Sequence, residues 1–193
     1  MRAIDLVIRQ IDGAHSLYHE IADDLTAREW TARVLPGSNR LGFTLWHPPR
    51  TQDWVIQTVL RGVPEVITEG RWQGRNHLQT PGIGAGFTSD EADVIAHGVA
   101  QADALDYADA VHQTSTDWLR TLTDDDLDMV PDMLTHQAPF AEYQQPDFLA
   151  EVRHLVGMPT WRFLLGPCSG HLRSHLGELE ILKQALRAPG QAS

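Results

Sequence analysis

The sequence predicts an all-α protein, a four-helix bundle with long connections between the second and third helices and between the third and fourth. In four segments, residues 3–25, 39–61, 90–122 and 169–187, apolar residues recur at the spacing of one helix face. Proline and glycine gather between these segments, and capping residues precede several of them. We expect residues 1–193 to form a single domain, because a chain of this length can bury roughly 70% of its unfolded surface around one core.

The first two helices are separated by Pro36-Gly37-Ser38-Asn39, whose last two residues can cap the helix that follows. The apolar stripe of the first helix consists of Ile4, Val7, Ile8, Ile11, Ala14, Tyr18, Ile21, Ala22 and Leu25. That of the second helix consists of Leu41, Leu45, Trp46, Trp54, Val55 and Val59. Pro48 and Pro49 lie inside the second helix, where proline removes a hydrogen bond and clashes with the carbonyl four residues earlier. We therefore expect this helix to kink or restart directly after His47.

The two later helices follow irregular stretches. Residues 62–87 are rich in glycine and proline, and Thr88 with Glu91 three residues later is a capping-box signature for the third helix. Residues 123–166 are mixed, with several prolines and a short helix expected over 147–157. The sequence shows no internal repeat, no coiled-coil heptads and no low-complexity tract.

The composition limits the classes of partner. The formal net charge is -11, from 15 basic and 26 acidic residues. Nucleic-acid binding depends on Lys and Arg that neutralise phosphates, so this balance without a basic run predicts no nucleic-acid partner. It argues equally against an anionic membrane surface, and no window approaches the ~20 apolar residues of a membrane span. The one cysteine, Cys168, excludes an internal disulfide and suits a cytoplasmic location.

Two histidine pairs have the spacing of ligands on one helix face. His171 and His175 lie four residues apart on the last helix, so two ring nitrogens can reach one metal ion at ~2.0–2.1 Å. His15 and His19 have the same spacing on the first helix. Either pair taken alone is equally well explained by exposed or hydrogen-bonded histidines. The context of His47 favours the last-helix pair, and we expect replacement of the first-helix pair to leave the metal content unchanged.

His47 lies within the stretch LGFTLWHPPRTQDW, near the middle of an otherwise apolar helix. The segment PGSNRLGFTLWHPPRTQDW resembles the second-helix signature of the DinB-like superfamily. The segment GHLRSHLGELEILKQAL is similar to the last-helix signature of the same superfamily. The order of elements is similar along the whole chain, although only these two segments are specific. The resemblance implies a four-helix bundle with a divalent metal ion held by three histidines, here His47, His171 and His175. This sequence departs from the family pattern at Pro48-Pro49, where relatives commonly carry helix-forming residues.

Further residues could complete such a site. Glu178 lies seven residues after His171 and three after His175, so it could be a fourth ligand, an acceptor behind a ligand or a general base. A solvated helix charge explains Glu178 equally well. Asp53 could support the site from the second helix, although a helix-surface carboxylate is the favoured interpretation. Cys168 is predicted to be a small buried residue rather than a thiolate ligand.

Two other patterns in the sequence bear on its function. The GxGxG string at residues 82–86 follows no strand and precedes no Lys-Ser or Lys-Thr pair, so it does not predict a phosphate loop. The six tryptophans are mostly core candidates, and Trp46, Trp54 and Trp161 are expected to line a pocket near the metal.

The resemblance also implies a function. Characterised relatives include low-molecular-weight-thiol-dependent transferases and isomerases, of the mycothiol-dependent maleylpyruvate isomerase type, and some metal-dependent hydrolases. Three neutral histidines leave a position open for water or substrate, the layout of a catalytic site, and zinc or nickel is the ion we expect. The alternatives are a non-catalytic metal-binding stress-response or small-molecule-binding module, and a structural protein whose histidines bind nothing. The expected partners are a small-molecule substrate or thiol and a second copy in a homodimer.

Overall fold

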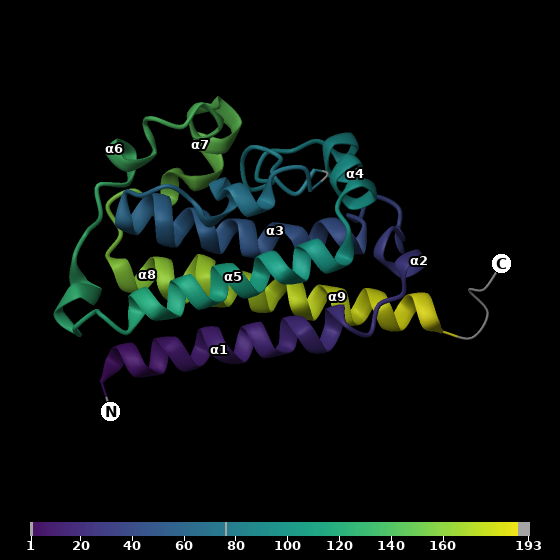
Figure 1. Cartoon of the computed structure of the whole chain (residues 1–193), viewed down its shortest axis with the longest axis horizontal. Coiled ribbons are helices and arrows are strands. Elements are labelled where there is room, and N and C mark those ends of the chain that lie inside the picture. The colour runs from purple at the N-terminus through teal and green to yellow at the C-terminus, as the bar shows by residue number, and fades with distance from the viewer. Residues whose placement is uncertain (1, 76, 189–193) are drawn as a thin grey trace.

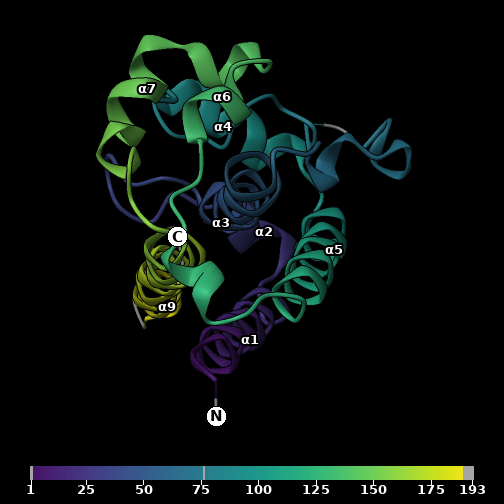
Figure 2. The same cartoon turned by 90° about the vertical axis from the view of Figure 1, so that its left-hand side faces the viewer.

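The computed structural model describes residues 2–75 and 77–188, and within them every regular element is helical. Four helices run along the long axis of the molecule (Figure 1): α1 (Ala3–Ala22), α3 (Leu41–Asp53), α5 (Gln101–Leu119) and α9 (Leu172–Arg187). Seen end on in Figure 2, they form a closed ring, because α1 and α3 each pack against both α5 and α9. The predicted all-α bundle is therefore confirmed, with shorter helices added in its connections.

Those shorter helices are α2 (Ala27–Trp30), η2 (Val66–Thr68), η3 (Gly70–Trp72), α4 (Ser89–Gly98), η4 (Asp125–Asp128), α6 (Met133–Gln137), η5 (Ala141–Gln144), α7 (Pro146–Val152), η6 (Arg153–Leu155) and α8 (Thr160–Leu165). Two π-helices, η1 (Trp54–Arg61) and η7 (Gly166–His171), continue α3 and lead into α9. In both figures α4, α6 and α7 cover α3 on the side away from α1. The second helix of the bundle is therefore enclosed on all sides, which is why nearly all of α3 is buried.

The paired prolines do not interrupt α3, so the prediction of a restart after His47 is wrong. Pro49 has no N–H to donate to the carbonyl of Leu45. The hydroxyl of Tyr18 on α1 donates to that carbonyl instead, at 3.1 Å, and so satisfies the acceptor that the proline leaves free. Helical hydrogen bonding changes only at Trp54, where η1 begins.

The third helix predicted over residues 90–122 is two helices, α4 and α5. Val99 and Ala100 between them have extended backbone, with ψ of 121° and 138°. The indole Nε1 of Trp30 donates to the carbonyl of Val99 at 3.1 Å, so a tertiary hydrogen bond stabilises the extended backbone between the two helices. The apolar periodicity continues across it, which is why the sequence predicts one helix. The Thr88 capping box is present as predicted and starts α4.

The buried apolar side chains form two clusters along the bundle. One contains Trp46 and the other contains Trp54, so the two clusters meet along α3 on either side of His47. Cys168 lies fully buried in the second cluster, as the sequence predicts, and burial raises the pKa of its thiol. Within the described ranges we find no helix with the length and apolar character that crossing a membrane requires.

Candidate metal centre

The packing of α3 against α9 brings His47, His171 and His175 together. The Nε2 atom of His171 lies 3.0 Å from Nε2 of His47 and 3.0 Å from Nε2 of His175. One ring nitrogen from each of the three lies within 4.8 Å of the other two. His47 is the most deeply set of the three, and the other two are half-buried. Three ring nitrogens from two facing helical segments thus converge on one point.

The second nitrogen of each ring decides what faces this point. Nδ1 of His47 lies against the carbonyl of Ile83, which can only accept, so Nδ1 carries the proton and Nε2 presents a lone pair. Nδ1 of His175 lies 3.2 Å from a carboxylate oxygen of Glu178, and the same reasoning applies. His171 then offers Nε2 to two lone pairs with at most one proton to share. A cation satisfies all three nitrogens and hydrogen bonding does not, so these residues fit a metal ion.

The electrostatics keep these rings in the form that a metal ion needs. Burial lowers the pKa of His47 to about 4, with the Ile83 carbonyl opposing the shift and His175 adding to it. Burial, together with a smaller effect of the two neighbouring imidazoles, lowers the pKa of His171 to about 3. Both rings are therefore neutral near pH 7, and no proton has to leave before their lone pairs bind a cation.

Glu178 is exposed and its carboxylate contacts Nδ1 of His175, the ring nitrogen that does not face the convergence point. Of the three roles predicted for it, this geometry supports an acceptor that orients a ligand rather than a fourth ligand. Asp53 also differs from expectation. It is fully buried, so the interpretation as a helix-surface carboxylate is wrong.

The three histidines open onto a cavity of about 900 Å³. Its wall is largely apolar and includes Trp54 and Trp161, as the sequence predicts. Trp46 does not line it, because this side chain is buried and donates from Nε1 to the carbonyl of Leu78 at 3.2 Å. Glu151, His154 and Arg162 bring polar groups to the same wall; the cavity thus suits a small organic molecule with a polar end.

Sequence reasoning missed the loop at residues 82–86, which forms part of this wall. Its three glycines have φ of +84°, +96° and +79°, values that favour glycine strongly. A Cβ at Gly84 would lie 2.9 Å from Cζ of Phe43 and 3.1 Å from Nδ1 of His47. The loop therefore approaches His47 closely enough for the Ile83 carbonyl to fix its ring. The spacing of the glycines was the available signal, since it marks backbone that must adopt positive φ.

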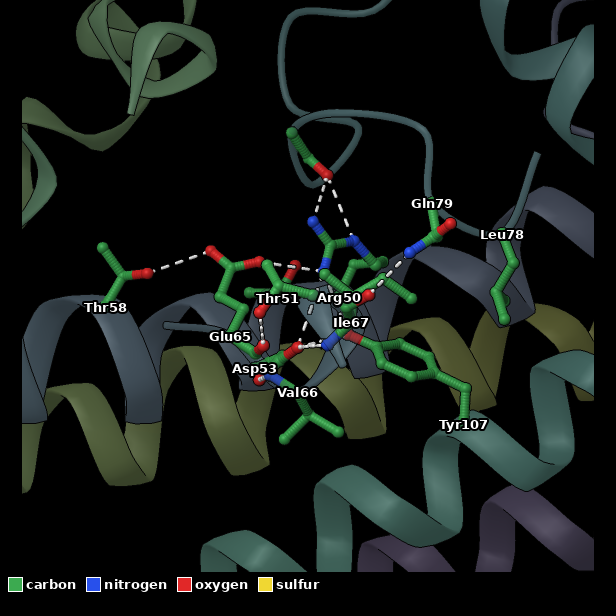
Figure 3. A network of polar contacts seen from close by, with 12 residues as sticks. Arg50, Thr51, Asp53, Thr58, Glu65, Val66, Ile67, Leu78, Gln79 and Tyr107 are labelled. Atoms are coloured by element: carbon green, nitrogen blue, oxygen red, sulfur yellow. Dashed lines mark hydrogen bonds and ion pairs between the residues drawn. The ribbon is translucent and has the colours of Figure 1, made fainter. Parts of the chain in front are cut away.

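Arg50, one turn after His47, binds the backbone of the same loop, residues 82–86. Its Nε and Nη2 atoms donate to the carbonyl of Gly82 at 3.2 and 3.0 Å. Its Nη1 atom lies 2.9 Å from Glu65 and 3.5 Å from Asp53, and all three side chains are at most 5% exposed (Figure 3). One guanidinium thus ties together a ligand-bearing helix, the glycine loop and two buried carboxylates.

Asp53 completes this network. Its carboxylate accepts hydrogen bonds from the backbone N–H groups of Val66 and Ile67, at 2.9 and 3.1 Å, and so caps η2 (Figure 3). It also accepts from the hydroxyl of Tyr107 on α5 at 2.7 Å. Burial and the neighbouring Glu65 raise the pKa of Asp53, against the opposing effect of Arg50. The residue supports the connection between α3 and the loop and does not approach the three histidines.

The fold and the site together define a class: a helical bundle that presents three imidazoles from facing segments to a cavity. The sequence model of the DinB superfamily matches residues 10–179, a stretch that includes all three histidines. The chain belongs to the DinB superfamily.

Other comparisons bear on the fold alone. The crystal structure of a conserved protein from Enterococcus faecalis is similar, with a TM-score of 0.72 over 96% of this chain and 97% of that one. The two sequences are 18% identical, so the likeness shows a shared fold. Among curated proteins, none matches this sequence.

Proposed function

We propose that this protein holds a divalent metal ion, zinc or nickel, with His47, His171 and His175, and that it acts as a metal-dependent, thiol-linked transferase or isomerase. The proposal is carried by the convergence of three ring nitrogens at the wall of a 900 Å³ cavity. Within the described residues no further His, Cys, Asp or Glu joins this group. A metal ion bound there supplies Lewis acidity, which polarises a carbonyl or lowers the pKa of a thiol or water.

The chain's own residues prepare the site for such chemistry. The Ile83 carbonyl and Glu178 hold the rings of His47 and His175 in the tautomer that directs Nε2 inward. Trp54 and its apolar neighbours exclude water and take up the apolar part of a substrate. Arg162 places a positive charge at the same cavity, which suits a substrate or thiol that carries a carboxylate.

The thiol must come from a cosubstrate. Cys168 is the only cysteine, it is fully buried, and it does not line the cavity. Burial raises the pKa of its thiol, so it does not supply a thiolate at neutral pH. A low-molecular-weight thiol would also persist in a reducing cytoplasm, the compartment that the single cysteine favours.

Cobalt-substituted protein tests this proposal. Addition of glutathione is expected to produce the near-ultraviolet absorption of a cobalt–thiolate bond, because a position beside the three histidines is open to the cavity. The same preparation is expected to catalyse the reaction of glutathione with chlorodinitrobenzene, in which the thiolate sulfur replaces chloride on the ring and chloride and a proton are released. Both signals should be much weaker in His171→Ala than in the parent and unchanged in the control His97→Ala, which changes an exposed histidine of α4. Metal binding with neither signal would favour the non-catalytic alternative.

The glycine loop gives a second prediction. Gly84→Ala is expected to weaken metal binding by about 10–100-fold, the range found for groups that orient a ligand. The added Cβ would displace the loop or the ring of His47, because it would lie 3.1 Å from Nδ1. Competition with a chromogenic chelator measures the affinity.

Gly37→Ala is the matched control for this loop. Gly37 also has positive φ, +81°, but a Cβ there meets nothing within 4 Å. This variant shares the backbone strain and should keep the metal affinity of the parent. An equal loss of affinity in both variants would show that the effect is general destabilisation, and the predicted role of the loop would then be wrong.

A further inference from the structure

A second group of imidazoles and carboxylates lies on the seam between α1 and α5. His15 and His19, one turn apart on α1, direct their Nε2 atoms to the same carboxylate oxygen of Asp109 on α5, at 2.9 and 2.7 Å. One donor atom from each of these residues lies within 4.8 Å of the other two. In the ring of helices this seam is opposite the one between α3 and α9 that carries the three histidines, so the two groups are separate (Figure 2).

The neighbourhood of this seam is rich in negative charge. Among the ion pairs of the described residues, Asp109 is paired only with His15 and His19. Asp12 is paired only with His112, whose Nε2 lies 3.2 Å away. These imidazoles therefore face two carboxylates, Asp109 and Asp12, that no Lys or Arg of the described chain neutralises by direct contact.

The geometry admits a cation after small side-chain movements. Two imidazole nitrogens and one carboxylate oxygen form a ligand set that divalent transition metals accept. Binding requires each ring to carry its proton on Nδ1 instead of Nε2, and the three donor atoms to move slightly apart around the ion. Nδ1 of His19 lies 3.7 Å from a carboxylate oxygen of Asp23, which can accept that proton's hydrogen bond after a small adjustment. The side chains of His15, His19 and Asp109 are 20%, 28% and 56% exposed, so an ion and its water ligands can enter from solvent.

We propose that His15, His19 and Asp109 form a second site for a divalent metal ion of the zinc type, which links α1 to α5. This revises the sequence-based expectation that replacement of His15 and His19 leaves the metal content unchanged. The sequence could not supply the third ligand, because Asp109 lies 94 and 90 positions from the two histidines. The site stands on its own group of residues and does not depend on the proposed activity.

Zinc titration of the untagged, chelator-stripped full-length protein tests the second site. The parent is expected to bind two zinc ions per chain. The triple variant His47→Ala, His171→Ala, His175→Ala should bind one, and adding Asp109→Asn to that triple variant should abolish binding. Zinc should also raise the Tm of the triple variant, and this rise should disappear with Asp109→Asn. A cluster held only by hydrogen bonds would not make the Tm depend on zinc.

The control is Asp106→Asn, which removes the same charge one turn earlier on α5, where Asp106 pairs with Arg75. It should leave both ions bound. A parent that binds only one ion, lost with the triple variant, would overturn the second site and leave the proposed function intact. A parent that binds only one ion, lost with Asp109→Asn, would support the second site and refute the first. Two ions retained in Asp109→Asn would show that this residue is no ligand.

Discussion

Replacement of His171 with alanine is expected to weaken metal binding at the three-histidine site by at least about 100-fold. His171 is the ligand whose Nε2 atom lies 3.0 Å from the Nε2 atoms of both His47 and His175. Its loss therefore removes the central ligand and leaves only two imidazoles at the site. Changes to residues that only orient a ligand already cost 10–100-fold in affinity, and loss of a ligand costs no less. The measurement is elemental analysis of untagged protein in the Asp109→Asn background, after dialysis against zinc buffered by a chelator.

The fold is expected to survive this change. His171 is half-buried at the cavity wall and belongs to neither of the two apolar clusters that flank it. Its Nδ1 atom is buried and finds no hydrogen-bond partner within the described chain, so alanine also removes an unsatisfied polar atom. The metal-free variant should therefore unfold at a Tm no lower than that of the metal-free parent. Full metal occupancy in the His171→Ala variant would contradict the three-histidine assignment.

The sequence could predict those parts of the site that depend on residues close together in the chain, and not those that depend on distant residues. The spacing of His171 and His175 is a local property of a helix, so it could be read from the sequence. The position of His47 came from its surrounding motif. By contrast, the Ile83 carbonyl that orients His47 is 36 residues away and carries no side-chain signal. A backbone acceptor of this kind is visible only when the loop has a defined path.

The same distinction explains the errors in the helices. Periodicity placed α1, α3, α5 and α9, because this signal acts within one helix turn. The predicted cap of α3 at Ser38 or Asn39 was wrong, since Arg40 is the N-cap residue and no side chain caps this helix. The prolines of α3 and the break at Val99 were misjudged because distant groups decide them. Tyr18 supplies the hydrogen bond that lets α3 continue, and Trp30 supplies the one that fixes the break. Each of these partners lies on another element, so propensity alone could not reveal it.

The largest loss of stability is expected from Arg50→Met, about 3–5 kcal/mol in the free energy of unfolding. This variant leaves Asp53 and Glu65 buried, at 0% and 4% exposed, with no guanidinium between them. It also removes two hydrogen bonds to the carbonyl of Gly82. For a domain of this size the loss corresponds to a fall in Tm of roughly 6–20 °C, which calorimetry of the metal-free protein measures.

Arg71→Met is the control for the loss of a guanidinium. Arg71 pairs with Glu69 at 2.7 Å, but the two side chains are 53% and 47% exposed. Exposed pairs contribute ~0–1 kcal/mol, so its Tm should stay close to that of the parent. Equal Tm shifts in the two arginine variants would mean that the buried network contributes no more than a surface pair.

The pH dependence separates a buried-charge effect from simple loss of packing. Burial and Glu65 raise the pKa of Asp53 to about 6 in the folded parent, above its ordinary value of 3.8. A raised carboxyl pKa gives a contribution to stability that is full below 3.8 and is lost as the pH rises through the folded value. Without Arg50 that folded value should rise further, so the deficit of Arg50→Met should grow as the pH increases from about 5 to about 8. Asp53→Asn in the same chain removes the ionisable group, and the double variant should lose most of this growth. A deficit independent of pH, with no change on adding Asp53→Asn, would assign the effect of Arg50 to packing and hydrogen bonding rather than to its charge.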